Sequence, residues 1–224
     1  MSMDDEWKQV YELRATRDIP DHRKACWSKE GFEELFELTL MFVDEVNNAS
    51  DDYPKSKIKT VLDVGCGPGI YCDALNKKGF VVTGVDYSEE MIKLAKQRYP
   101  HINFIEGSGY NLPFENKSFD LVISIGTLQC LSDHEKFLRE ICRVANKSVI
   151  LSTLWRDDNG EDPKLVFERD LRNDSWPTRE YHSSEIVPMF ERNGFSCKII
   201  RDNEKTKNKI KDGFFIIASK NPKL

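Results

Sequence analysis

Between residues 58 and 154, short apolar runs of strand length alternate with segments of helical periodicity. Strands that are apolar along nearly their whole length belong to parallel sheets with helices on both faces. This alternation predicts a doubly wound, mostly parallel α/β fold. The predicted strands are 58–64, 80–86, 102–107, 118–126 and 148–154, and the predicted helices are 70–78, 88–99 and 132–146.

Local signals set the ends of these helices. Ser88 is a predicted N-cap, followed by two glutamates in the favourable first turn. Gly79 is expected to stop the first helix, and the spacing of Ser132 and Glu135 predicts a capping box for the third.

The flanking regions differ from this alternation. Residues 1–50 are expected to form a helical cap, and residues 155–182 an insertion, because their polar and aromatic stretch is too long for a simple connection. A helix over 183–195, with Pro188 near its start, and two closing strands at 196–202 and 213–219 complete the expected plan. We expect residues 1–224 to form a single domain.

The stretch VLDVGCGPGIY, residues 61–71, places three glycines at alternate positions between a strand and a helix. Ligands of open parallel sheets bind beyond the carboxyl ends of the strands, where this loop falls. A dinucleotide fingerprint would have the spacing G-x-G-x-x-G, and Ile70 stands at its third glycine. Asp63 would also repel a pyrophosphate, whereas it suits a cationic ligand. Asp86, at the end of the second strand, can accept hydrogen bonds from a ribose diol.

With VTGVDYSEEMIKLAKQR, NLPFENKSFDLVIS and TLQCLSDHEKFLREICRV, this stretch makes the chain resemble the class I S-adenosylmethionine-dependent methyltransferases of the broad small-molecule type, close to the type 11 domain. The resemblance covers about residues 60–154, and the last helix and strand pair follow the same plan. It implies a Rossmann-like sheet of seven strands, with the last strand inserted antiparallel, and S-adenosyl-L-methionine as the cofactor.

The resemblance also assigns roles by position. The glycines are expected to pass beneath the cofactor, Asp63 to face its methionine end, Asp86 to bind the ribose and Tyr87 to stack near the adenine. Ser108 stands where many relatives have an acid, so backbone groups of the next two residues are expected to replace that contact. The expected cofactor-binding residues are Asp63, Gly65, Cys66, Gly67, Gly69, Asp86, Tyr87, Ser108, Gly109, Tyr110 and Ser124.

The catalytic group is harder to assign. Many relatives have a histidine after the fourth strand, where this chain has Gln129 and Cys130. Gln129, Tyr181 and His182 are the candidates, while a small buried residue is the favoured interpretation of Cys130. His134 is interpreted as a solvated helix residue.

The acceptor pocket has two possible sources. Aromatic residues and arginines of the insertion would suit an anionic or planar acceptor, although a solvated surface excursion is an equal alternative. The N-terminal helices could form a lid or simply pack. The side chains concerned are Trp155, Arg156, Arg169, Arg172, Trp176, Arg179, Tyr181 and His182 in the insertion, and Trp7, Tyr11 and Trp27 near the N-terminus.

Composition limits the function classes. A net charge of -5 argues against nucleic acid as a partner, and no apolar run approaches a membrane span. The six cysteines and four histidines form no metal-ligand pattern, so no metal is expected, and reduced thiols in the cytoplasm are the favoured interpretation.

We expect a methyltransferase acting on a small molecule. The alternatives are a methyltransferase acting on tRNA or protein, and a non-catalytic cofactor-binding partner protein. The sequence leaves the oligomeric state and the methylated atom open.

Overall fold

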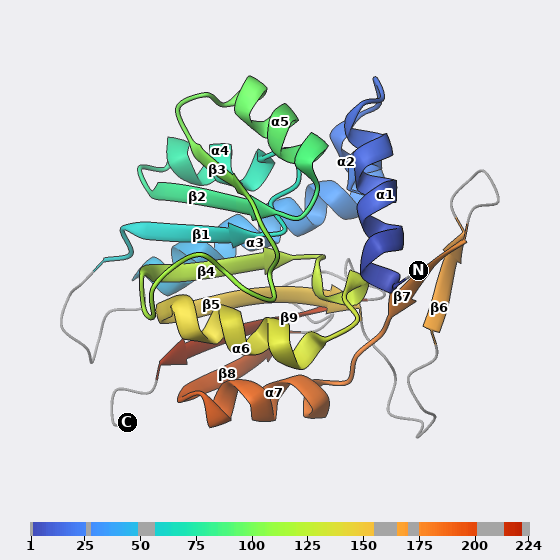
Figure 1. Cartoon of the computed structure of the whole chain (residues 1–224). Coiled ribbons are helices and arrows are strands. Elements are labelled where there is room, and N and C mark those ends of the chain that lie inside the picture. The colour runs from blue at the N-terminus through green and yellow to red at the C-terminus, as the bar shows by residue number, and fades with distance from the viewer. Residues whose placement is uncertain are drawn as a thin grey trace.

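The computed structural model describes residues 2–25, 28–48, 57–154, 165–169, 175–200 and 213–220. Its main sheet has seven strands in the order β3-β2-β1-β4-β5-β9-β8 (Figure 1). The strands of this sheet are β1 (Thr60–Val64), β2 (Val81–Asp86), β3 (Asn103–Glu106), β4 (Phe119–Ile125), β5 (Ala145–Leu154), β8 (Phe195–Ile200) and β9 (Gly213–Lys220).

The sheet has the predicted mixed direction. Strands β1 to β5 pair in parallel, whereas β9 pairs antiparallel with both β5 and β8. The expectation of a doubly wound sheet with its last strand inserted antiparallel is therefore confirmed.

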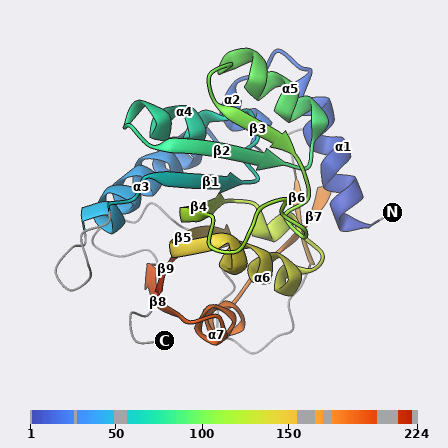
Figure 2. The ribbon, with the colours of Figure 1, turned by 60° about the vertical axis from the view of Figure 1, so that its left-hand side comes forward.

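Helices cover both faces of the sheet (Figure 2). One apolar core joins the sheet to α3, α4 and α5, and the other joins it to α6 and α7. Neighbouring residues of a strand enter opposite cores, as Val61 and Leu62 do, because side chains alternate along a strand. The helices are α1 (Met3–Ala15), α2 (Asp21–Lys24), α3 (Lys29–Asn48), α4 (Ile70–Lys77), α5 (Glu89–Arg98), α6 (His134–Val144) and α7 (Ser183–Arg192), with a 3-10 turn, η1, at Leu128–Cys130.

The expected ends of two helices are confirmed. The Ser88 hydroxyl accepts a hydrogen bond from the Met91 amide at 3.2 Å and caps α5. Gly79, with a φ of +94°, follows the end of α4.

The expected capping box of α6 is wrong by one residue. Asp133 is the N-cap, and its carboxylate accepts from the Lys136 amide at 2.9 Å. Ser132 instead donates its hydroxyl and its amide to Asp4 of α1. A distant partner has therefore replaced the local one.

Two details of the C-terminal half differ from expectation. Pro188 lies inside α7, beyond its first turn, where the ring leaves the Ser184 carbonyl without its helical donor. Within the predicted insertion, β6 (Leu165–Arg169) and β7 (Ser175–Arg179) pair antiparallel as a separate hairpin that the sequence did not predict.

The N-terminal helices lie beside the sheet, not in a separate body. Helix α3 packs into one of the two cores, while α1 crosses the carboxyl ends of the strands (Figure 1). In the described part of the chain, no helix is both long and apolar enough to cross a membrane.

Candidate active site

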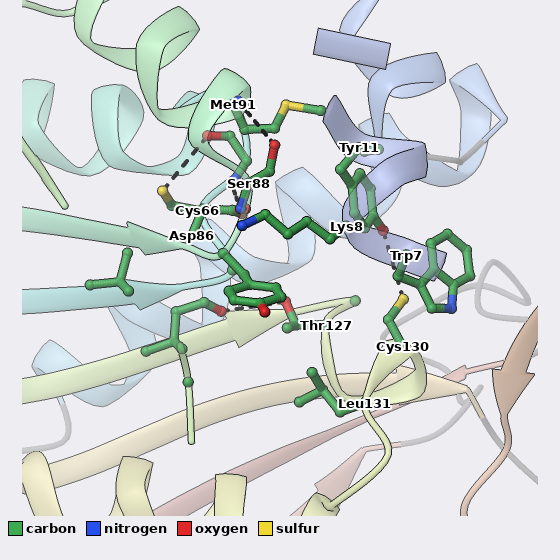
Figure 3. Close-up of a pocket in the computed structure, with 18 of the residues that line it drawn as sticks. Trp7, Lys8, Tyr11, Cys66, Asp86, Ser88, Met91, Thr127, Cys130 and Leu131 are labelled. Atoms are coloured by element: carbon green, nitrogen blue, oxygen red, sulfur yellow. Dashed lines mark hydrogen bonds between the residues drawn. The ribbon is translucent and has the colours of Figure 1, made fainter. Parts of the chain in front are cut away.

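A cavity of about 320 Å³ lies at the carboxyl ends of β1, β2 and β4, beneath α1 (Figure 3). One end is formed by the glycine loop after β1 and by residues that follow β2. At the other end, Tyr11 of α1 points toward Cys130, and Trp7 packs with Cys130 in a small apolar cluster. Leu131 also lines the cavity. The cavity thus joins the predicted ligand loop to a wall of aromatic and sulfur groups.

The three glycines of the loop serve different purposes, although all have a positive φ. A Cβ at Gly65 would collide with the Thr127 side chain, and one at Gly69 would lie 2.7 Å from the Phe104 ring. A Cβ at Gly67 would meet no atom within 4 Å, and Gly67 lines the cavity. Gly65 and Gly69 therefore allow close packing of the protein, whereas Gly67 leaves space for a ligand.

Asp86 is held firmly beside this loop. One carboxylate oxygen accepts from the Gly67 amide at 2.8 Å, and the other accepts from the Ser88 amide at 2.9 Å. Burial raises the pKa of Asp86, while these backbone donors act in the opposite direction. Each oxygen keeps a further lone pair, so the carboxylate can still accept hydrogen bonds from a ligand in the cavity.

Asp63 is the penultimate residue of β1 and is 1% exposed. Burial raises its pKa to about 7, opposed by a hydrogen bond from the Cys72 thiol at 3.4 Å. Asp63 does not line the cavity, so its expected contact with the methionine end would be indirect. The nearby negative charge of Asp86 raises the pKa of Asp63 further, because the two carboxylates repel each other. A cation in the loop would relieve this repulsion.

The expected adenine side surrounds the loop after β3. Tyr87, Ser108, Gly109 and Tyr110 all line the cavity. A Cβ at Gly109 would come within 2.5 Å of the Phe137 ring, which explains a glycine there. Tyr87 is not stacked on an aromatic partner in the described structure; instead its ring lies 4.3 Å from the Lys8 ammonium.

The remaining two expected cofactor residues have different surroundings. Cys66 lines the cavity, and burial raises its pKa to about 11, which keeps the thiol protonated at neutral pH. Ser124 is fully buried and donates to the Val64 carbonyl at 2.9 Å, so it supports the strand end and does not line the cavity. Gly69 is likewise outside the cavity lining.

The three catalytic candidates lie outside the cavity lining. Gln129 is buried in η1 and accepts from the Thr153 hydroxyl at 3.4 Å. Tyr181 is fully buried and donates to the Leu128 carbonyl at 3.3 Å. His182 caps α7, since its Nδ1 accepts from the Ser184 amide at 3.2 Å. These contacts give each of the three residues a structural role: Gln129 and Tyr181 are buried and hydrogen-bonded, and His182 caps α7.

Tyr181 belongs to a small cluster next to η1. Its ring lies beside His134 and beneath the Arg179 guanidinium, and Arg179 contacts the His134 Nδ1 at 3.2 Å. Burial and then the Arg179 charge lower the pKa of His134. His134 is thus half-buried rather than solvated. The rest of the predicted insertion pocket lies outside the described residues or side chains, namely Trp155, Arg156, Arg169, Arg172 and Trp176, as does Trp27.

Sequence reasoning did not assign several residues that line the cavity. Asp4, Lys8, Thr127 and Leu131 were missed, and Trp7 and Tyr11 were noted only as part of a possible lid. Trp7 and Tyr11 are four residues apart and stack with ring centroids at 5.4 Å. That spacing was the available signal, because it places two aromatic rings on one helical face.

Comparison with known proteins identifies the family. The family described as "Methyltransferase domain" matches residues 62–152. A phthiotriol/phenolphthiotriol dimycocerosates methyltransferase of Mycobacterium ulcerans is 30% identical over 213 residues, which cover 88% of this chain and 76% of that protein. The chain belongs to the class I S-adenosylmethionine-dependent methyltransferases.

Other matches are partial or distant. An ajmaline N-methyltransferase of Rauvolfia serpentina is 36% identical over 124 residues, but the match covers only 51% of this chain and 43% of that enzyme. Magnesium protoporphyrin IX methyltransferase from Synechocystis, solved with bound S-adenosylmethionine, has 16% identity and a TM-score of 0.62. That match covers 97% of this chain and 90% of the other, and shows a shared fold.

The protein is therefore an S-adenosylmethionine-dependent methyltransferase, and the expected cofactor is confirmed. The described residues of the cavity fit this cofactor. Gly67 leaves room above the loop, and the Asp86 carboxylate is oriented by two amides while retaining free lone pairs.

Proposed function

We propose that the enzyme methylates a small molecule that binds at the α1 end of the cavity. The observation that carries this proposal is one continuous cavity with the Asp86 carboxylate at one end and the stacked Trp7 and Tyr11 rings at the other. Two of the relatives, whose names refer to phthiotriols and to ajmaline, support a small acceptor.

The cofactor would occupy the end formed by the glycine loop. We propose that Asp86 binds its ribose and that the cofactor passes through the space above Gly67. Its adenine would lie against the wall formed by Tyr87 and the loop 108–110. Cys66 would contribute a neutral wall. Asp63, Gly69 and Ser124 would support the loop and strand end from beneath it.

S-adenosylmethionine supplies an electrophilic methyl group whose carbon is activated by the adjacent sulfonium. The protein's contribution to such a displacement is alignment and exclusion of water. Trp7, Tyr11 and Leu131 form an apolar surface opposite the glycine loop, and we propose that they orient the acceptor toward it. Planar apolar groups suit this surface, because aromatic rings stack well on one another.

We also propose that the hairpin β6–β7 helps to form the acceptor site. This hairpin lies within residues 155–182, the insertion that the sequence analysis gave as a possible source of the acceptor pocket. Strand β7 contacts both α1 and η1, which brings it to the same end of the cavity. We retain 155–182 as a proposed acceptor-side insertion on this ground, and residues 1–50 as a proposed cap within a single domain.

A cytoplasmic location is also proposed. It is supported by cysteines 66, 72, 130, 142 and 197, which are all free thiols in the structure. The net charge of -5 supports a partner other than nucleic acid.

The test is a methyl-transfer screen with S-adenosylmethionine carrying a radiolabelled methyl group. The purified enzyme is incubated separately with small-molecule extracts, with tRNA and with a protein fraction. Label should enter the small-molecule extract and depend on the enzyme. Label that enters only tRNA or only protein would overturn the proposed acceptor class, and a lack of cofactor binding by calorimetry would overturn the site assignment.

A further inference from the structure

Asp4, in the first turn of α1, binds two segments that lie far along the chain. The Tyr110 hydroxyl donates to its carboxylate at 2.5 Å. Ser132 donates its amide at 3.2 Å and also its hydroxyl. The Asp133 amide in turn donates to the Tyr110 hydroxyl at 3.2 Å. We call these four residues, Asp4, Tyr110, Ser132 and Asp133, the clasp.

The clasp lies at the meeting point of three walls of the cavity. Tyr110 lines the cavity from the loop after β3, and Ser132 follows Leu131, which lines the opposite wall. Helix α1 carries Trp7 and Tyr11 into the cavity as its roof. A single carboxylate therefore connects the roof to the proposed adenine side and to the proposed acceptor side.

Further contacts of α1 reach the same side of the cavity. The Lys8 ammonium lies 4.3 Å from the centre of the Tyr87 ring and 3.9 Å from the Glu106 carboxylate. The Tyr11 hydroxyl and the Cys130 sulfur are 3.7 Å apart. The roof thus makes polar contacts, spread along two helical turns, with the residue after β2, the last residue of β3 and the turn η1 after β4.

The clasp can open without large cost. Ser132 and Asp133 are exposed, so water can replace the lost partners. The polar contacts of α1 therefore favour its closed position but allow it to open. An element that covers a binding site must be able to do both, because ligands have to enter and leave.

We propose that Asp4 is a positioning residue, which acts through Tyr110 to couple the docking of α1 to cofactor binding. This inference rests on the proposed placement of the adenine beside Tyr110. A bound cofactor would order the loop after β3 and so fix the position of the Tyr110 hydroxyl. The fixed hydroxyl would keep its hydrogen bond to Asp4, and this bond would keep α1 docked. By linkage, a docked α1 strengthens cofactor binding by the same factor. Cofactor binding would then complete the roof that presents Trp7 and Tyr11 to the acceptor.

The test measures hydrogen exchange in residues 3–15 of the full-length enzyme, with and without saturating S-adenosylhomocysteine. Stopped-flow binding gives the dissociation rate of the same ligand. Wild type should gain protection in α1 on binding. Tyr110→Phe should lose most of this gain and release the ligand about tenfold faster, the size expected for losing a hydrogen bond to a charged group.

Three further variants separate the clasp from general effects on the helix. Asp4→Ala should behave like Tyr110→Phe, whereas Asp4→Asn keeps an acceptor oxygen and should recover part of the protection. Glu6→Ala removes a carboxylate from the same end of α1 but lies outside the clasp, so it should behave like wild type. Tyr110→Phe changes no residue of α1, so an effect on α1 exchange cannot come from altered helix propensity.

Two results would overturn the inference. If S-adenosylhomocysteine binds Tyr110→Phe and protects α1 as fully as in wild type, the clasp does not couple the two events while the proposed function stands. If the ligand fails to bind the wild-type enzyme at all, the proposed cofactor site is wrong, and the clasp loses its basis with it.

Discussion

The backbone amide of Gly67 donates a hydrogen bond of 2.8 Å to the carboxylate of Asp86, nineteen positions later in the chain. This bond joins the loop after β1 to the end of β2, two segments that sequence analysis assigned to one ligand site for separate reasons. The ligand space and the acid that faces it are thus parts of one hydrogen-bonded unit.

Replacing Asp86 by Ala should weaken S-adenosylmethionine binding by roughly 30-fold or more. Two hydrogen bonds to a charged acceptor are lost from the ligand, a cost on the order of 2–4 kcal/mol. Calorimetric titration of the purified variant measures this change. An affinity equal to that of wild type would show that the ribose lies elsewhere. Asp73→Ala, which removes a carboxylate of α4 that lies outside the cavity lining, provides the control.

The glycines of the loop should separate binding from stability. Gly67→Ala places a methyl group in the ligand space and should reduce cofactor affinity at least tenfold, while the left-handed φ costs about 1–2 kcal/mol of stability. Gly69→Ala carries the same conformational cost and adds a clash with the Phe104 ring, so its melting temperature should fall further. Thermal melts with and without S-adenosylhomocysteine distinguish the two, and equal losses of stability would contradict the different roles.

Asp63 should make the stability of the ligand-free enzyme fall as pH rises. Its pKa is about 7 in the folded state and about 3.9 when unfolded, so between these values the folded state binds more protons. The Asp63 contribution is therefore lost progressively from about pH 4 to pH 7. Asp63→Asn cannot ionise, so its stability relative to wild type should increase from pH 5 to pH 8. Urea unfolding at both pH values provides the measurement, and a constant difference would contradict the raised pKa.

The same carboxyl group should link cofactor binding to pH. A cationic ligand favours ionised Asp63, so below pH 7 binding should release a proton, and affinity should rise toward pH 8. Calorimetry at pH 6 and pH 8 on wild type and Asp63→Asn cancels the ionisation of the ligand itself. The increase should be several-fold larger in wild type, and identical pH profiles would show that Asp63 does not sense the ligand.

Changes at Tyr11 should affect acceptor use more than cofactor binding. Tyr11→Leu removes the aromatic surface at the acceptor end and should raise the KM for an acceptor found in the screen by roughly tenfold, whereas Tyr11→Phe keeps the ring and should have a smaller effect. The cofactor dissociation constant should stay within about threefold of wild type in both, since Tyr11 lies opposite the glycine loop. Equal KM values in the three proteins would place the acceptor elsewhere, with the hairpin β6–β7 as the next candidate.

The sequence by itself determined the sheet and the ligand loop, because both are written in local patterns. Apolar runs of strand length specify β1, β2 and β4. The three alternate glycines between a strand and a helix indicate a ligand loop at the carboxyl end of that strand. The cap of α5 at Ser88 was predictable for the same reason, since the hydroxyl binds an amide three residues away.

Only the tertiary structure decided which side chains complete the cavity. Ser132 had the right spacing for a local cap, but Asp4 lies 128 positions away and takes its hydrogen bonds. Gln129, Tyr181 and His182 had suitable chemistry, yet the fold uses their polar atoms within the protein. Trp7 and Tyr11 become the roof because α1 crosses the strand ends. No local pattern records such contacts, since their energy depends on segments that meet only when the whole chain has folded.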